Sequence, residues 1–243
     1  MSTLAIVPDS SSPGRATFSD RVMGLMARVD YRRADTVDDR EAIFRLRYQA
    51  YLREGAIVPR ADERFSDPFD EAPNASIFGV YIDGRLASSI RLHVTSQDCT
   101  ELPALTVFSD YIEPELSRNK VIVDPTRFVT NLEASRAFPE LPYVTVRLAW
   151  LAAKYFDADH LLATVRAEHR AFYQRVFGHR AICEPRVYPT LTKKISLMSV
   201  DYEAVKDSLY RRYPFFRSNF FERRMLFAQH TPQPAQIMRP IAA

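Results

Sequence analysis

Residues 77–94 read IFGVYIDGRLASSIRLHV and carry the clearest structural signal of the chain. Two mainly apolar runs flank the pair Asp83-Gly84. Such a pair predicts a tight turn, because both central turn positions favour the positive φ that glycine and aspartate tolerate. The stretch therefore predicts a β-hairpin with strands at 77–82 and 86–94, and Arg91 lies on the second strand.

Upstream of the hairpin, helical and strand patterns alternate. Apolar residues recur at helical spacing over 18–29 and predict a short amphipathic helix that packs over the core as a lid. A first strand is expected at 31–34, and Thr36 with Asp39 resembles a capping box that opens a helix to about residue 54. Residues 55–74 are rich in proline and charge without a sustained period, so we expect a loop.

Downstream of the hairpin the expected helices span residues 107–116, 142–156 and 167–177, and the expected strands span 120–130, 161–165, 181–188 and 193–201. Pro125 indicates a bulge or an edge position in its strand, because proline cannot donate a ladder hydrogen bond. Gly178 follows the last helix, where glycine commonly supplies the left-handed cap.

The composition is that of a globular protein, with 243 residues, 47% hydrophobic and 26% charged. We expect one domain over residues 16–230, with an N-terminal helical lid and aromatic-rich C-terminal helices, between disordered ends at 1–15 and 231–243. No run reaches the roughly 18 apolar residues of a membrane helix, and the polar N-terminus does not resemble a secretory signal. A cytoplasmic protein is therefore expected.

Charge and cysteine content exclude several classes. The net charge of +3 comes without a recognisable nucleic-acid reader motif, so no nucleic-acid partner is expected. Cys99 and Cys183 lie far apart without ligand spacing, which argues against a zinc site or a disulfide framework. Asp67 and Asp70 lack the further spaced oxygen ligands that a divalent cation needs, and no metal site is expected.

A series of charged residues stands at the boundaries of the expected elements, namely Arg47, Asp67, Asp70, Arg91, Asp124 and Arg127. Their local sequences are RLRYQAY at 45–51, SDPFD at 66–70, SSIRL at 88–92 and VDPTRFV at 123–129. Over about residues 31–200 the chain resembles the acyl-homoserine-lactone synthases and, more closely, the N-acyl amino acid synthases. The order of elements resembles the GNAT acyltransferase fold. This resemblance implies an α/β (α+β) protein with a mixed, mostly antiparallel twisted sheet flanked by helices.

The resemblance implies that these six residues, together with Thr126, line the cleft for the acyl acceptor. An amino acid presents a carboxylate, and Arg91 or Arg47 offers it a planar two-pronged donor. Alternatively, the arginines organise the acidic loop by pairing with Asp67 and Asp70, which are also expected to tie down the N-terminal lid.

Two residues are candidates for proton transfer. Asp124 is the expected base for the acceptor amine, and because it stands where homoserine-lactone synthases have Glu, its shorter side chain favours a water relay. Its alternative role is to pair with Arg127 or to hold the loop. Tyr173, in AFYQRVFG at 171–178, resembles the GNAT tyrosine that protonates the departing thiolate, and its alternative role is core packing.

The donor site departs from the usual GNAT pattern, because the Gly-rich pyrophosphate loop, Gln/Arg-x-x-Gly-x-Gly/Ala, is absent. Residues 130–142 offer only Arg136 and the amides at the start of the next helix, which fits a lone phosphopantetheine phosphate. We therefore expect acyl carrier protein as donor and partner, with acyl-CoA as the alternative and no bound cofactor. Phe128, Val129 and Thr130 are expected to bind the donor, and their amides to polarise its carbonyl.

A carrier protein is acidic, so its docking face is expected to be basic, from Arg147, Lys154, Arg166, Arg170, Arg175 and Arg180. Their alternative role is ordinary solvated charge. The acyl chain needs an apolar channel, for which the candidates are Phe128, Trp150, Leu148 and Leu162. The histidines belong to no triad motif and are expected at surface or packing positions.

These observations predict an N-acyltransferase that moves a fatty acyl group from acyl carrier protein to the amine of an amino acid or a similar small acceptor. One alternative is a homoserine-lactone synthase that uses S-adenosylmethionine and releases methylthioadenosine. A second is a non-catalytic protein of the same fold that binds acyl carrier protein or lipid.

Overall fold

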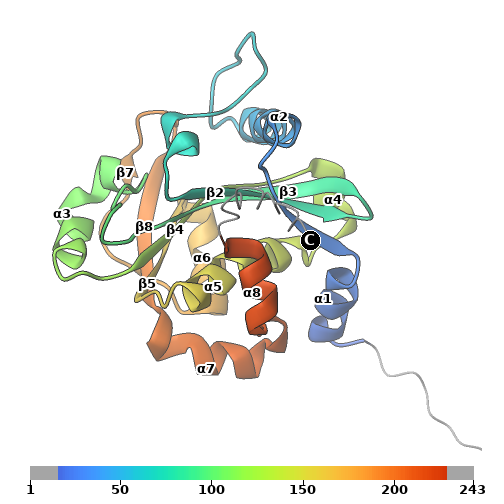
Figure 1. Ribbon diagram of the computed structural model, residues 1–243. Helices are drawn as coiled ribbons and strands as arrows, with labels where there is room; N and C mark the ends of the chain where they lie inside the picture. Colours follow the sequence, from blue (N-terminus) through green and yellow to red (C-terminus); the bar gives the residue numbers. More distant parts are fainter. Residues whose placement is uncertain (1–15, 229–243) are drawn as a thin grey trace, which may run out of the picture.

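A twisted sheet runs through the molecule between layers of helices (Figure 1). The computed structural model describes residues 16–228, so the ends expected to be disordered lie outside the described residues. The strand order is β1-β2-β3-β4-β5-β8-β6, with β7 also paired to β8, and only β4 and β5 run parallel. The strands are β1 (Val29–Arg33), β2 (Ala75–Ile82), β3 (Arg85–Val94), β4 (Ile122–Thr130), β5 (His160–Val165), β6 (Arg180–Ala181), β7 (Arg186–Val187) and β8 (Lys194–Asp201).

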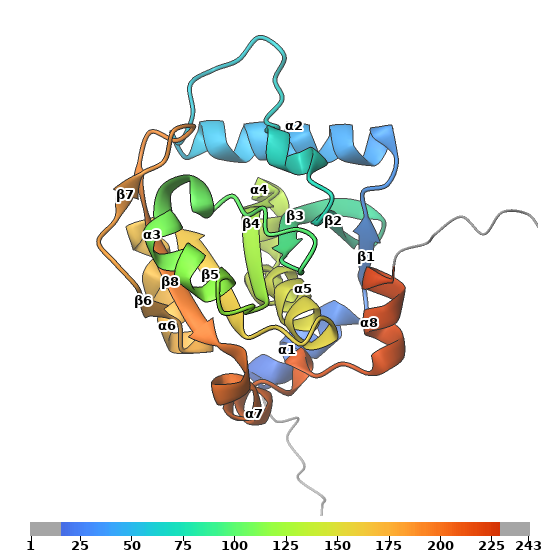
Figure 2. The same ribbon diagram turned by 60° about the vertical axis from the view of Figure 1, so that its left-hand side comes forward.

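Helices α2 and α3 cover one face of the sheet, and α5 and α8 cover the other (Figures 1 and 2). Alternate strand residues serve the two faces: Ile122 packs with α3, and Val123 packs with α5. The α-helices are α1 (Phe18–Met26), α2 (Val37–Arg53), α3 (Leu105–Leu116), α4 (Leu132–Ala137), α5 (Leu141–Tyr155), α6 (Arg170–Phe177), α7 (Tyr202–Arg212) and α8 (Phe220–Phe227). Three short 3-10 helices are η1 (Pro68–Glu71), η2 (Ala167–His169) and η3 (Pro214–Phe216).

The predicted hairpin is confirmed as β2 and β3. Asp83 and Gly84 both have positive φ, 48° and 78°, as a tight hairpin turn requires. The strand expected at 181–188 is instead divided into β6 and β7, each of two residues and each paired to β8. Pro185 lies between them, and it cannot donate to the ladder.

Strand β4 is flanked by β3 and β5, but its pairs with β5 end at Val123, so Pro125 has a strand partner on the β3 side only, as in an edge position. The expected bulge lies in the same strand, just after Pro125. The register between β3 and β4 slips between the pairs Ser89–Val129 and Arg91–Thr126, which leaves one extra residue on β4. Arg127 lies in this bulge with φ of 54°. On its other side, β4 pairs with β5 only through Ile122 and Val123, and the two strands then separate.

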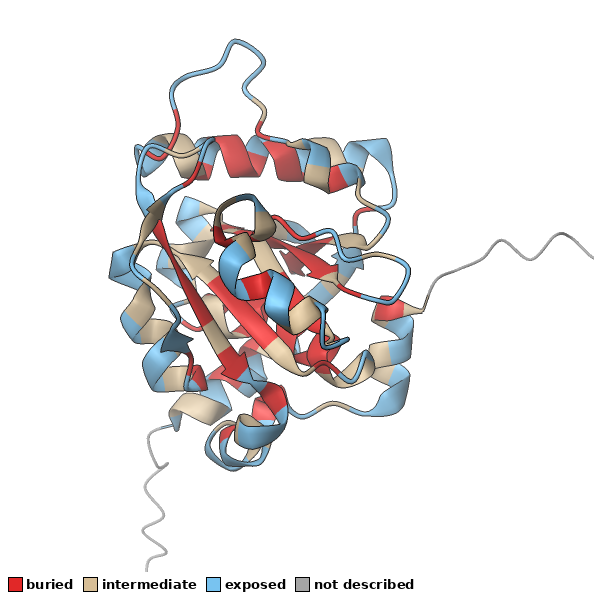
Figure 3. Cartoon of the chain, turned by 90° about the vertical axis from the view of Figure 1, so that its left-hand side faces the viewer, coloured by how far each residue is buried: buried red, intermediate tan, exposed pale blue. Residues whose placement is uncertain are grey.

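The apolar core is densest on the α5 face. Figure 3 shows buried residues along the central strands and on one side of α2. Trp150 of α5 is fully buried and stacks on Phe177 at 5.6 Å between ring centroids. Arg147 is also buried: its Nε donates to the Phe215 carbonyl at 2.6 Å, and its Nη1 donates to Glu222 at 2.5 Å. Arg147 therefore anchors the C-terminal helices and is not part of a docking face, contrary to expectation.

Helix α1 packs against α5 and η3. It begins at Thr17, whose side chain and that of Asp20 form a capping box, and Arg21 binds Glu140 at 2.7 Å. The expected tie between this helix and the acids Asp67 and Asp70 is absent from their described hydrogen bonds, which go to arginines and to the backbone of their own loop. Within residues 16–228, no helix has both the length and the apolar character to span a membrane.

Candidate active site

A cavity of about 440 Å³ lies where β4 and β5 separate. Residues from Pro125 to Thr130 of β4 form one wall, and Thr164 and Val165 at the end of β5 form the other. Beyond Val123, β4 has no strand partner on this side, so its backbone groups there are available to a ligand. The gap in the sheet thus supplies a partly apolar channel with a polar backbone edge.

The residues expected to bind the donor divide into two groups. Phe128, Val129 and Thr130 all line the cavity, whereas Arg136 is exposed in the last turn of α4 and is not among the lining residues. Of the expected channel residues only Phe128 reaches the cavity. The other three, Trp150, Leu148 and Leu162, are packed in the core.

The sequence did not single out several cavity residues, because they come from segments far apart in the chain. Tyr51 and Glu54 come from the end of α2, Tyr143 from α5, and Leu191 and Lys193 from the segment before β8. Their only sequence signal is their proximity to the ends of expected elements. At the same rim, Arg166 donates to Glu54 at 2.6 Å, so this expected docking arginine is already paired.

Beside the cavity, five charged side chains form a buried cluster. Arg47 Nη1 donates to Asp70 Oδ1 at 2.8 Å, and Arg91 Nη1 donates to Asp67 Oδ1 at 2.6 Å and to Asp70 Oδ1 at 2.8 Å. Arg127 Nε donates to Asp67 Oδ2 at 3.0 Å. The arginines are at most 7% exposed, and the carboxylate side chains at most 9%. The structure therefore unites five of the predicted site residues through direct ion pairs.

Local structure explains how the two acids reach the arginines. Asp67 is the N-cap of η1 and accepts from the Phe69 N–H at 3.0 Å, while Asp70 accepts from the Asp67 N–H at 3.0 Å. This is a capping box built of two aspartates around Pro68, within a segment where the sequence predicted only a loop. The two carboxylates that cap the N–H groups of η1 therefore also bind the guanidinium groups.

The bulge in β4 turns two successive residues toward this cluster. Thr126 Oγ1 accepts from Arg91 Nε at 3.0 Å, and the next residue, Arg127, binds Asp67. Successive residues of a regular strand would face opposite sides of the sheet. Since Thr126 and Arg127 also line the cavity, the cavity and the charged cluster share a wall.

The cluster holds three guanidinium groups against two carboxylates. Burial lowers the pKa of Arg47 to about 10, partly offset by Asp70. For Asp67, burial raises the pKa, but Arg127 and Arg91 outweigh it and bring the value to about 2. Arg47 Nε and Nη2 are buried and find no acceptor among the described groups. A buried positive charge with unused donors favours an anionic ligand.

Asp124 lies apart from the salt bridges. It is fully buried, and its Oδ2 accepts from the Ala104 N–H, just before α3, at 3.1 Å. Burial raises its pKa to about 6, although the Ala104 N–H and Arg91 favour the ionised form. The expected alternative pair with Arg127 is not among its described bonds, because Arg127 binds Asp67. A carboxyl group with a pKa near neutrality suits proton transfer.

Tyr173 of α6 also lines the cavity. Burial raises its pKa, so its hydroxyl keeps a proton near neutral pH and can donate it. Its ring also contacts Phe172 and His179, with centroids 5.3 and 5.5 Å away. The structure thus allows both the acid role and the packing role.

The start of α5 differs from the expected phosphate site. The Leu141 N–H donates to the Phe138 carbonyl at 3.0 Å, the Tyr143 N–H donates to the Glu140 carbonyl at 3.0 Å, and Pro142 has no N–H. The Glu140 carboxylate also lies at this helix start, paired with Arg21. The amides expected to hold a phosphate are therefore occupied or missing, and a negative charge already stands beside them.

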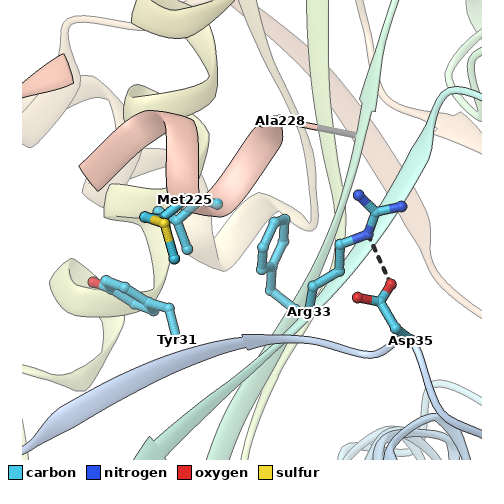
Figure 4. A pocket seen from close by; sticks show the side chains of 7 residues that line it. Tyr31, Arg33, Asp35, Met225 and Ala228 are labelled. Atoms are coloured by element: carbon cyan, nitrogen blue, oxygen red, sulfur yellow. Dashed lines mark ion pairs between the residues drawn. The ribbon is translucent and has the colours of Figure 1, made fainter. Parts of the chain in front are cut away.

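A second hollow of about 330 Å³ lies between β1 and α8 (Figure 4). Tyr31, Phe78 and Met225 line it, and Arg33 at its edge pairs with Asp35 at 2.9 Å. None of the predicted site residues lines it. Among residues 16–228, no group of three or more His, Cys, Asp or Glu side chains could hold a metal ion.

The family model for the N-acyl amino acid synthase FeeM matches residues 42–201. This span contains the charged cluster, Asp124, both walls of the cavity and α6. The chain belongs to this family. It is thus an acyltransferase of the FeeM family. No curated protein matches it significantly.

Solved structures place the FeeM-family chain among GNAT-like folds. The structure of FeeM, an N-acyl amino acid synthase from uncultured soil microbes, superposes with a TM-score of 0.63 at 17% identity, over 74% of this chain and 94% of that one. BjaI, a CoA-dependent acyl-homoserine lactone synthase solved with MTA, gives 0.52 at 15%, over 76% and 89%. A putative N-acetyltransferase from Lactobacillus plantarum gives 0.50 at 14%, over 72% and 98%. The expected mixed, mostly antiparallel fold is confirmed.

Proposed function

We propose that this protein moves a fatty acyl group from the phosphopantetheine thioester of acyl carrier protein to the amine of an amino acid. The observation that carries the proposal is the shared wall between an acyl-sized cavity and a buried, positively charged cluster. The cavity would hold the thioester and its chain. The cluster would hold the acceptor, whose two charged ends need opposite partners.

Arg47 supports the choice of an amino acid as acceptor. Its Nε and Nη2 are two donors on one side of a planar guanidinium, and a carboxylate can accept from both at once. Asp70 fixes the remaining nitrogen, Nη1. Arg91 is less suited, because its Nε and Nη1 already bind Thr126, Asp67 and Asp70. Of the two candidate arginines, we therefore assign the carboxylate to Arg47.

The donor is argued from the start of α5. Coenzyme A carries a pyrophosphate that other GNAT enzymes hold with free amides, and this helix start offers occupied amides and the Glu140 carboxylate. A carrier protein presents its thioester through contacts between two proteins and needs no pyrophosphate cradle. The exposed Lys193 at the cavity, together with the exposed Arg175 on α6, would steer an acidic carrier toward it.

The reaction would be a direct attack on the thioester. Asp124 takes a proton from the acceptor's ammonium, the nitrogen bonds to the acyl carbon, and the C–S bond breaks. Those amides of residues 128–130 that face away from β3 would polarise the carbonyl. Tyr173 would protonate the departing thiolate.

The test is a product screen by mass spectrometry. Purified protein is incubated with carrier proteins loaded with different acyl chains, or with the matching acyl-CoAs, together with amino acids and S-adenosylmethionine. An N-acyl amino acid formed from the carrier-bound donor, and lost in Asp124→Asn, supports the proposal. An acyl lactone with methylthioadenosine would replace it with the lactone synthase reaction. No product despite tight binding of the carrier would favour a binding protein.

A further inference from the structure

His93 lies directly opposite Asp124 in the sheet. The two residues are Cα partners in the register of β3 and β4, as Arg91 and Thr126 are two positions further along. The Arg91–Thr126 hydrogen bond shows that these positions project from the same face. Side chains at directly opposed positions have Cβ atoms about 4.5–5.5 Å apart. Of the surface and packing positions expected for the histidines, His93 takes the buried one, but packing alone leaves one of its nitrogens unexplained.

The surroundings of His93 decide which nitrogen carries its proton. Nε2 lies 3.0 Å from the Phe69 carbonyl oxygen, and a carbonyl only accepts. Nε2 must therefore be protonated, and Nδ1 of the neutral ring is a bare acceptor. Burial and the nearby Arg91 lower the pKa of His93 to about 4, so the ring is neutral near pH 7.

Each side chain keeps one atom that no described group satisfies. His93 Nδ1 and Asp124 Oδ1 are both buried without a hydrogen-bond partner within residues 16–228. Near pH 7 both are acceptors, because the ring is neutral and the carboxylate is mostly ionised. Two acceptors cannot bond to each other without a proton between them. One group that donates at least two hydrogen bonds would satisfy both atoms at once.

We propose that His93 Nδ1 and Asp124 Oδ1 together form the seat for the acceptor's ammonium nitrogen, with His93 as the hydrogen-bond acceptor that positions the nitrogen and Asp124 as the base. This rests on the proposed function. An ammonium group is a donor of three hydrogen bonds and no acceptor, which matches the seat.

The proton balance of the reaction explains why a second hydrogen-bond acceptor, His93 Nδ1, is useful beside Asp124. The nitrogen enters with three N–H bonds and ends as a secondary amide with one, so two protons leave it. One moves to Asp124 before the lone pair attacks the acyl carbon. As the C–S bond breaks, Tyr173 gives its proton to the departing thiolate and takes the second proton from the new amide nitrogen, directly or through water, and Asp124 then releases the first proton to solvent. Throughout, His93 keeps one N–H directed at Nδ1, so that the lone pair forms toward the thioester.

Two substitutions separate the two nitrogens of His93. In His93→Gln the amide can replace Nε2 as the donor to Phe69 but leaves no acceptor at Nδ1. In His93→Asn the amide oxygen can replace Nδ1 but does not reach Phe69. We expect kcat to fall about tenfold or more in His93→Gln and to stay within about threefold in His93→Asn. His160→Gln, on β5, is the matched control and should be unchanged.

A wild-type kcat and pH profile in His93→Gln would overturn the proposal. So would an equal loss in both variants, because that would assign His93 only the structural bond to Phe69. The pH profile matters because removing the Nδ1 acceptor should shift the acidic limb set by Asp124. The charged and titratable groups around the pair are Arg91 on the same strand, Asp67 and Asp70 from the η1 segment, and Tyr188, which interacts with Asp124, and they are unchanged in both variants.

An NMR measurement decides the inference without any product. In the full chain with ¹⁵N-labelled histidine, His93 should show the Nε2–H tautomer, and its Nδ1 resonance should move in a titration step that is absent from Asp124→Asn. An Nδ1–H tautomer, or an identical titration in Asp124→Asn, overturns the pair. If the wild type forms no product from any donor, the proposed function fails, and this titration still decides the pairing.

Discussion

At the centre of the sheet, β3 and β4 present different chemistry on their two faces. Toward α5 and α8, β3 and β4 present Ile90, Leu92 and Val123 to a core that closes around Trp150. Toward α2 and α3, the same strands present Arg91, His93 and Asp124, which are equally buried. Apolar burial stabilises the first face in proportion to its area, whereas buried charges are favourable only while each keeps its partner. The comparison teaches that the apolar face mainly stabilises the fold, whereas the polar face holds the side chains that could take part in the reaction.

The largest loss of stability is expected on the apolar face. Trp150→Ala removes a fully buried ring that packs against Phe177, Tyr202 and Phe216, and should lower the free energy of unfolding by about 4 kcal/mol. Denaturant unfolding measures this loss. The kcat of the folded fraction should stay near that of the wild type. A large loss of kcat at full folding would contradict the division of labour between the faces.

On the polar face, Asp70→Asn should cost stability and activity together. It leaves the buried guanidiniums of Arg47 and Arg91 without their shared carboxylate, at a cost of about 3 kcal/mol or more. Glu71→Gln is the matched control from the same 3-10 helix. Its exposed pair with Arg40 should contribute less than about 1 kcal/mol. Equal unfolding midpoints for the two variants would show that the cluster is not a unit.

Asp124→Asn should make the protein more stable and less active. Because the folded-state pKa of Asp124 is raised, to about 6 from 3.8, its contribution to stability is present below pH 3.8 and is lost as the pH rises through 6. The variant lacks this loss and should gain up to about 3 kcal/mol above pH 7, with no gain near pH 4. Product formation should fall by about 10²-fold or more.

Thermal unfolding of both proteins across pH 4 to 8 measures the difference for Asp124→Asn. If the stabilities of the wild type and the variant changed with pH in parallel, burial would not raise the pKa of the Asp124 carboxyl. The pKa of Asp67 is lowered instead of raised, so this residue changes stability with pH in the opposite direction to Asp124, and it does so equally in the wild type and the variant. Its pKa of about 2 gives stability that is present above pH 3.8 and lost toward pH 2, so it cancels from the comparison.

The smallest effect concerns the wall between cavity and cluster. Thr126→Val removes the acceptor of Arg91 Nε and should cost about 1–2 kcal/mol, because a buried donor loses its partner. The apparent KM for the acceptor should rise more than kcat falls, since Arg91 orients the cluster. Thr192→Val, at an exposed hydroxyl on the Gly55 carbonyl, should change stability by less than about 0.5 kcal/mol. If Thr126→Val changed stability as little as Thr192→Val does, the wall between the cavity and the cluster would not contribute to the site.

Local sequence signals predicted most of the elements and the set of charged residues. The hairpin at Asp83-Gly84 and the cap at Gly178 depend on backbone preferences within a few residues, and both are confirmed. The acids of SDPFD were recognised, but their capping box was missed, because its pattern uses Asp where Glu or Gln is usual. Arg147 was predicted on the surface because a basic residue on a helix usually faces solvent. Its buried position depends on the Phe215 carbonyl and Glu222, which lie far away in the sequence.

What the sequence by itself determined is the order of helices and strands and the identity of the residues that could carry charge. Only the tertiary structure decided which of them meet. Three features depend on register between strands about 30 to 40 residues apart: the separation of β4 from β5, the bulge that turns Thr126 and Arg127 to one face, and the pairing of His93 with Asp124. Register is fixed by the packing of whole faces and by no local preference, and for that reason His93 gave no signal in the sequence.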